Sequence, residues 1–112
     1  METEIENAII ADNSYKELEG LIEKWAEEKG ILGKATPIKQ AEKTLEEVRE
    51  LMQAITLENK EEVVDALGDI LVTIIIQAKM QGLDLLECLR TAYGVISKRK
   101  GEMIDGFFVK NN

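Results

Sequence analysis

The sequence contains two groups of acidic residues whose spacing suits the binding of a metal ion. Their members are Glu46, Glu47 and Glu50 in the first group and Glu62, Asp65 and Asp69 in the second. Because residues three or four apart lie on one face of a helix, each group presents its carboxylates together if its segment is helical. Fourteen residues separate Glu50 from Asp65, which is enough for an antiparallel turn that brings the two acidic faces together.

The ligands in these groups are all carboxylate oxygens, which favour Mg²⁺, with Mn²⁺ as a substitute, over zinc or copper. The sequence has no histidine and a single cysteine. This excludes Ser-His-Asp and Cys-His catalysis, the usual catalytic zinc sites and the histidine-containing di-iron bundles. Protein-bound Mg²⁺ commonly shares its ligand shell with substrate phosphates, so a polyphosphate substrate and a metal-activated water would suit such a site.

The acidic groups also admit a simpler interpretation, because E-E-x-x-E runs are common on solvated helix surfaces. Asp65 and Asp69 argue against it, since they lie within the apolar segment ALGDILV. Burying an unpaired carboxylate there would cost several kcal/mol. We therefore expect these acids to be buried and to need a cation.

The segment 61–80, EEVVDALGDILVTIIIQAKM, must position the second acidic group. Its β-branched run, ILVTIII, would also suit a buried strand. We predict one helix, because the acidic face continues into the apolar run without a Gly-Pro breaker and no second strand of comparable strength is present to pair with it. Apolar residues surround most of this helix, so it must be covered on more than one side.

Three further helices are predicted, over about 14–30, 37–55 and 84–100, with a loop at 30–36. All four helices begin just after residues that suit an N-terminal cap, namely Ser14, Thr36, Asn59 and Asp84. Gly101 is the expected C-terminal cap of the last helix. The helix over 37–55 carries an apolar stripe that is expected to face the core, formed by Ala41, Leu45, Val48, Met52 and Ile55.

The predicted fold class is all-α: a single domain over residues 1–112, built as an antiparallel four-helix bundle-like protomer. Residues 1–13 are a weakly patterned N-terminal arm, and residues 102–112 are a C-terminal tail that turns at Asp105-Gly106. A chain of 112 residues offers too few helices to cover the helix over 61–80. We therefore expect an intertwined homodimer or a dimer of dimers.

Charge and composition restrict the partners. The 22 acidic and 14 basic residues give a net charge of −8, which argues against nucleic acid and anionic membranes as partners. The N-terminus lacks the basic and then apolar segments of a secretory signal, and the longest apolar run is too short to span a bilayer. The cytoplasm is the expected location.

Two stretches of the sequence resemble the MazG-like, all-α nucleoside triphosphate pyrophosphohydrolases, in particular their compact phage and mobile-element members. The stretches are QAEKTLEEVREL at 40–51 and DALGDIL at 65–71, and the family motif is E-E-x-x-E followed after a gap by E-x-x-D. The resemblance covers about residues 21–109. It implies Mg²⁺-dependent hydrolysis of a (deoxy)nucleoside triphosphate to the monophosphate and pyrophosphate, as in house-cleaning of the nucleotide pool.

The resemblance also implies a set of metal ligands. The positions that match the family are Glu47, Glu50 and Asp69. At the glutamate of E-x-x-D this chain has Ala66, so Asp65 or Glu62 would have to supply the fourth ligand; E-x-x-D can also be read as Glu62-Val63-Val64-Asp65. Ala66 equally suits a different class of protein, a non-catalytic acidic helical dimerisation module that keeps the fold.

Catalytic and substrate-binding roles follow from the same resemblance. Glu46 and Glu47 are the catalytic candidates; Glu46 would either support the metal ligands from behind or orient the attacking water. The substrate-binding candidates are Lys43, Lys98 and Arg99 for phosphates and Trp25 for stacking on a base. Each of these four also has a structural interpretation: Lys43 as a surface residue, Trp25 as core, and the bases at 98 and 99 as partners of a helix dipole.

Overall fold

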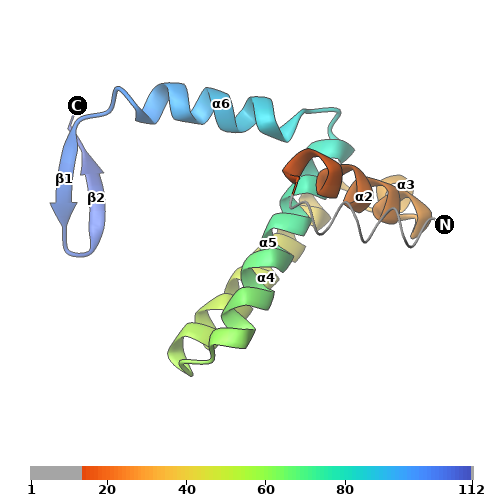
Figure 1. Cartoon of the computed structure of the whole chain (residues 1–112), viewed down its shortest axis with the longest axis horizontal. Helices are drawn as coiled ribbons and strands as arrows, with labels where there is room; N and C mark the ends of the chain where they lie inside the picture. The colour runs from red at the N-terminus through yellow and green to blue at the C-terminus, as the bar shows by residue number, and fades with distance from the viewer. Residues whose placement is uncertain (1–13, 112) are drawn as a thin grey trace.

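Helices make up most of the structure, a computed structural model that describes residues 14–111 (Figure 1). Its elements are α2 (Tyr15–Glu28), α3 (Ile31–Lys34), α4 (Pro37–Thr56), α5 (Lys60–Met80), α6 (Leu85–Ile96), β1 (Gly101–Ile104) and β2 (Phe107–Lys110). The all-α prediction is confirmed. The expected N-terminal arm, 1–13, lies outside the described residues. Over 14–111, no helix has the length and apolar character needed to cross a membrane.

Side-chain caps confirm the predicted helix starts. A side-chain oxygen accepts a hydrogen bond from a backbone N–H of the first turn at Ser14, Thr36, Asn59 and Asp84. Each such bond satisfies a donor that the helix itself leaves unpaired, and stabilises the helix end by about 1 kcal/mol. The segment that would also have suited a strand is helical throughout, from Lys60 to Met80.

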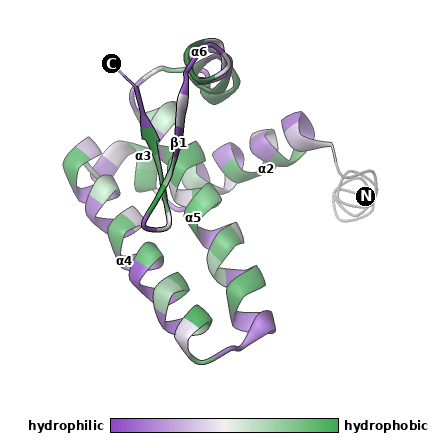
Figure 2. Ribbon diagram, turned by 90° about the vertical axis from the view of Figure 1, so that its left-hand side faces the viewer, coloured by the Kyte–Doolittle hydropathy of each residue, from purple (hydrophilic) through white to green (hydrophobic). Residues whose placement is uncertain are grey.

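The helices α4 and α5 form a long antiparallel hairpin (Figures 1 and 2). The buried side chains of α4 are small or polar and lie seven residues apart: Gln40, Glu47 and Ala54. Those of α5 are Ala66, Thr73, Ile75, Ile76 and Ala78. Three hydrogen bonds cross between the helices, one of them from Gln77 Nε2 to the backbone oxygen of Pro37 at 2.9 Å. Gln40 Nε2 donates to the backbone oxygen of Thr73 at 3.1 Å, and Thr44 Oγ1 donates to Thr73 Oγ1 at 2.9 Å. The hairpin is therefore held within one chain.

The predicted apolar stripe of α4 does not face α5. Leu45, Met52 and Ile55 are 50%, 62% and 57% exposed. The prediction that they form the core is wrong for the single chain, because α5 packs on the side of α4 that carries Gln40 and Glu47. In agreement, Figure 2 shows apolar residues around the outer sides of the hairpin as well as between its helices.

Two predicted features before α4 and after α6 need correction. The 30–36 segment is not wholly loop, because Gly30 adopts a left-handed conformation (φ 77°) and starts the short helix α3. Gly101 is not the cap of the last helix, since α6 ends at Ile96 with Ser97 as its cap. Gly101 instead begins β1, where a Cβ would lie 2.2 Å from the backbone oxygen of Val109. Only glycine fits this close approach.

The C-terminal tail forms a two-stranded antiparallel hairpin. Gly101 pairs with Lys110 and Ile104 with Phe107. The predicted turn at Asp105-Gly106 connects the strands, and both of its residues have positive φ, 49° and 85°, as a tight two-residue hairpin turn requires.

The predicted four-helix bundle is incomplete, because its fourth helix, α6, does not pack along the others. Helices α2 and α3 pack on α5 beside α4. Helix α6 meets α5 and the first turn of α2 only at its own start, where Tyr15 and Leu85 line one cavity, and it then projects away from the hairpin (Figure 1). The chain changes direction at Gly82, which has a φ of 69°. Within the described residues, the helices therefore form only three sides of the predicted bundle.

Candidate metal centre

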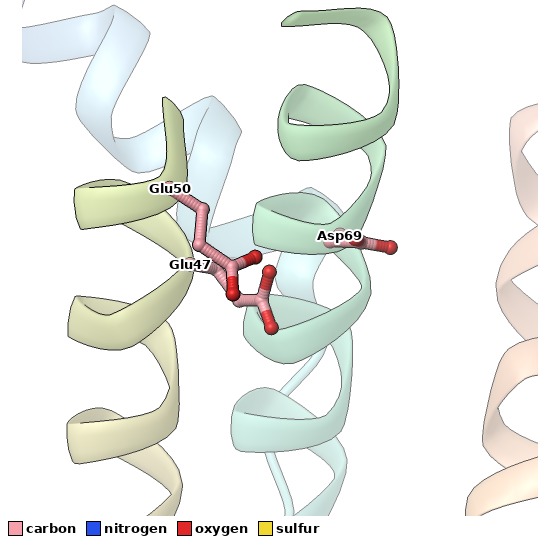
Figure 3. A group of neighbouring side chains, drawn as sticks. All are labelled: Glu47, Glu50 and Asp69. Carbon is pink, nitrogen blue, oxygen red and sulfur yellow. The ribbon is translucent and has the colours of Figure 1, made fainter. Parts of the chain in front are cut away.

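Three carboxylates from two helices converge on one point of the α4–α5 hairpin. Glu47 and Glu50 lie one turn apart on α4, and Asp69 comes from α5 (Figure 3). Each offers an oxygen, and these oxygens lie within 4.8 Å of one another. We call these three residues the acid triad. The predicted convergence of the two acidic faces is thus present, because the antiparallel turn at 57–59 brings the two helices side by side.

Glu47 is the buried member of the acid triad, at 7% exposure. Its Oε1 lies 3.3 Å from Lys43 Nζ, which also lies 3.4 Å from Glu46 Oε1. Its other oxygen, Oε2, is buried and has no hydrogen-bond partner among the described residues. A buried carboxylate oxygen without a partner is costly. The unpaired oxygen, together with a donor set made only of carboxylates, fits a hard divalent cation such as Mg²⁺.

The electrostatics of the acid triad also favour a cation. The neighbouring Glu47 raises the pKa of Glu50, by accepting a hydrogen bond from its protonated form and by repelling its charge. Desolvation raises the pKa of Asp69 above its ordinary value, and repulsion from Asp65 and Glu47 adds to this. The carboxylates therefore destabilise one another when ionised, and a bound cation would remove that repulsion.

A cavity of ≈250 Å³ opens beside the acid triad. Its walls come from α2, α3, α4 and α5 and include Trp25, Lys43, Glu47 and Asp69, with Gln40 and Thr73 among the remaining lining residues. Trp25 is 46% exposed, so it is not simply a core residue. The cavity is smaller than the roughly 300–1,000 Å³ usual for small-molecule sites. It would hold part of a larger ligand and leave the rest at the surface.

The structure does not bring Glu62 or Asp65 into the acid triad. Asp65 is exposed, one turn from Asp69, and Glu62 lies near the tip of the hairpin, where it shares a second cavity with Glu50. The expectation that Asp65 and Asp69 are buried is wrong for Asp65 and only half met by Asp69, because the acidic face of α5 borders solvent. Ala66 is 4% exposed and belongs to the buried side of α5.

The basic candidates near the C-terminus lie elsewhere in the protomer. Lys98 and Arg99 line a cavity with Lys100 and Lys110, at the junction of α6 and the β-hairpin. Figure 1 shows this junction at the far end of α6 from α5, away from the acid triad. Within one chain, only Lys43 and Trp25 of the predicted substrate-binding residues stand beside the acids.

Sequence reasoning missed the polar layer under the cavity. Gln40 and Thr73 are both 6% exposed and hydrogen-bonded to each other's helix. The signal that would have found Gln40 is its seven-residue spacing to Glu47 and on to Ala54, since residues at this spacing share the side of a helix that packs against a neighbour.

Comparison with known proteins identifies the chain. A family model described as the MazG nucleotide pyrophosphohydrolase domain matches residues 35–103, more than half of the chain and the part that contains the acid triad. No curated protein and no solved structure matched the chain in the corresponding searches.

Proposed function

The chain belongs to the MazG nucleotide pyrophosphohydrolase family, and we propose that it hydrolyses a (deoxy)nucleoside triphosphate to the monophosphate and pyrophosphate with Mg²⁺. The observation that carries this proposal is the acid triad, whose oxygens approach within 4.8 Å beside a cavity that also contains Trp25 and Lys43. The acids suit the metal ion, the ring of Trp25 suits the nucleobase, and the positive charge of Lys43 suits a phosphate.

The acid triad would hold the metal, and bound Mg²⁺ would neutralise phosphate charge and lower the pKa of a water. Lys43 contacts both Glu46 and Glu47 and is placed to bind a phosphate beside the metal. Glu46, on the exposed side of Lys43, is proposed to orient the attacking water. That water's oxygen would bond to the α-phosphorus while the bond from this phosphorus to the oxygen that bridges to the β-phosphorus breaks. Pyrophosphate would leave with the bridging oxygen, and the water's proton would pass to solvent. Trp25 would stack on the base.

The second candidate function is a non-catalytic helical dimerisation module. One observation favours it: the family glutamate is replaced by Ala66, which is buried at 4% exposure, so the fourth ligand is not supplied from that position. Thermal melting separates the two candidates. A shift of the melting temperature with Mg²⁺ and a non-hydrolysable triphosphate supports the enzyme, since ligand binding stabilises the folded state, and an unchanged melting temperature supports the module.

We propose that the active form is a homo-oligomer, a dimer or a dimer of dimers, that works on free nucleotides in the cytoplasm as part of nucleotide-pool house-cleaning. It is supported by the large number of exposed apolar side chains, among them Val64 at 72% and Phe107 at 74%. Exposed apolar side chains in such numbers suit an interaction site. Nucleic acid and membranes are not proposed partners, in line with the net charge of −8.

The direct test is a screen of the eight common nucleoside triphosphates for pyrophosphate release, with Mg²⁺ and with a chelator. We expect release with at least one of them, dependent on the metal. Glu50→Gln serves as the inactive control, and Glu42→Gln, an exposed glutamate on the same helix paired with Lys39, serves as the matched active control. Equal release by wild type and Glu50→Gln would refute the assigned site.

A further inference from the structure

The cavity beside the acid triad extends along the α4–α5 hairpin, away from the carboxylates. Gln40, Lys43 and Glu47 line it from successive turns of α4, and Asp69 and Thr73 line it from α5. Seven residues separate Gln40 from Glu47, which is ~10 Å along the helix axis. The acids therefore mark one end of the cavity, and Gln40 and Thr73 lie toward the other.

Most of the other residues that line this cavity are apolar. They are Trp25, Ile31, Val72 and Ile76, and Ile76 is 3% exposed. Under the proposed function, the base of the nucleotide lies here against the face of the Trp25 ring. The polar edge of a base loses its bonds to water when it enters such a site, so each edge group needs a partner from the protein. The few polar atoms at this end therefore decide which bases bind.

The side-chain amide of Gln40 is held in one orientation. Its Nε2 donates to the backbone oxygen of Thr73 at 3.1 Å, and a carbonyl oxygen can only accept a hydrogen bond. The amide nitrogen must therefore point to α5, which turns the amide oxygen, Oε1, to the other side of the group. Gln40 is 6% exposed, so its side chain has little room to turn over.

The amide oxygen of Gln40 is free to accept a hydrogen bond from a ligand. Within the described chain, the bond from Nε2 is the one hydrogen bond of this side chain. Glu47 Oε2 is the one side-chain oxygen or nitrogen of the described residues that is fully buried without a partner, so Gln40 Oε1 is not fully buried. The open space that Gln40 lines is this cavity. It therefore receives an unused acceptor.

The hydroxyl of Thr73 adds no free donor at this end. Its Oγ1 donates to the backbone oxygen of Ile70 at 2.7 Å and accepts from Thr44 Oγ1 at 2.9 Å. A hydroxyl has a single proton, so that of Thr73 is engaged within the protein. Gln40 and Thr73 together offer a bound base an acceptor and no donor.

We propose that Gln40 selects nucleotides whose base carries an exocyclic amino group, cytosine and adenine, over those with a carbonyl oxygen at the same ring position. This inference rests on the proposed function. The amino group donates to Gln40 Oε1, whereas the carbonyl oxygen of uracil, thymine, guanine or hypoxanthine places two acceptors together with no proton between them. Turning the amide over would offer that carbonyl a donor, but it would break the bond to Thr73 and set two carbonyl oxygens against each other.

Two matched pairs of substrates test this selection. The members of each pair, dCTP with dUTP and dATP with dITP, differ in whether one ring position carries an amino group or a carbonyl oxygen. For the wild type, kcat/KM of pyrophosphate release should be at least about tenfold higher for the amino member of each pair. Gln40→Met keeps the length of the side chain and removes the amide, so both ratios should fall close to one. Gln53→Met, at an exposed glutamine of the same helix, should keep the wild-type ratios.

The ratios separate a role in specificity from a structural one. Loss of a purely structural contact would slow all four substrates alike and leave both ratios unchanged in Gln40→Met, which would overturn the inference. Equal kcat/KM within each pair for the wild type overturns it as well. Circular dichroism checks the folding of the variant, and Gln40→Asn, which withdraws the amide by one methylene, replaces it if it does not fold. A wild type that releases no pyrophosphate from any nucleotide refutes the proposed function instead, and the inference falls with it.

Discussion

The α4–α5 hairpin and the C-terminal arm, which comprises α6, β1 and β2, differ in how they bury their side chains. The hairpin buries small, polar and aliphatic side chains, among them Ile75 and Ile76, and Gln40, Thr44 and Thr73 join its helices by hydrogen bonds. The arm has no such layer and exposes its aromatic and aliphatic side chains. The comparison shows that one region packs within a single chain, whereas the other leaves most of its apolar side chains exposed. Four experiments test this difference between the two regions.

The largest effect is expected at the acid triad. Asp69→Asn should lower pyrophosphate release by about a thousandfold or more, because a metal ion contributes several kcal/mol of transition-state stabilisation. The free energy of unfolding should stay unchanged or rise without Mg²⁺, since desolvation and, after it, repulsion from Asp65 and Glu47 raise the pKa of Asp69 in the wild type. Steady-state kinetics and urea unfolding measure the two quantities. A destabilised variant would mean that Asp69 has a structural role.

The next effect concerns the stability of the hairpin. Gln40→Ala removes a buried amide that donates to the backbone oxygen of Thr73, and should reduce the free energy of unfolding by about 1–3 kcal/mol. Gln53→Ala, an exposed residue of the same helix, is the matched control and should stay within about 0.5 kcal/mol of wild type. Equal losses in the two variants would show that the polar layer does not hold the helices together.

A more local effect is expected in the arm. Gly101→Ala places a Cβ 2.2 Å from the backbone oxygen of Val109, so the two strands must separate. Amide hydrogen exchange of residues 101–110 should become faster while protection in α4 and α5 stays unchanged. Gly33→Ala, where a Cβ meets nothing within 4 Å, should leave both regions as they are. Faster exchange in α4 and α5 would show that these helices and the β-hairpin are coupled within one chain.

The smallest effect is a dependence of stability on pH. The pKa values of Glu50 and Asp69 are raised above their ordinary values of 4.5 and 3.8. The folded chain then keeps protons that the unfolded chain has lost, so their contribution to stability is present at low pH and falls as pH rises through the folded pKa values. Without Mg²⁺, wild type should lose more stability across this range than the Glu50→Gln, Asp69→Asn double variant. Identical pH profiles in urea unfolding would contradict the repulsion.

Much of the local structure could be predicted from the sequence because its causes are local. The caps at Ser14, Thr36, Asn59 and Asp84 and the turn at Asp105-Gly106 depend on a few neighbouring residues. The convergence of the acid triad followed from helical spacing and a short connection.

The features that could not be predicted from the sequence depend on tertiary packing. The sequence does not reveal which side of α4 meets α5, because Leu45 and Met52 form a more apolar stripe than the Gln40 and Glu47 side that is buried. The end of α6 at Ile96, rather than at Gly101, depends on strand pairing with Lys110. The separation of Lys98 and Arg99 from the acids arises from the direction of a whole helix, which no local pattern encodes.

The central claim is that carboxylates of α4 and α5 together bind a divalent cation. Titration with Mn²⁺, followed by electron paramagnetic resonance, tests it without reference to any substrate. We predict saturable binding by wild type and by Glu42→Gln, and loss of that binding in both Glu47→Gln and Asp69→Asn, one from each helix. Binding that survives in these two variants would contradict the claim.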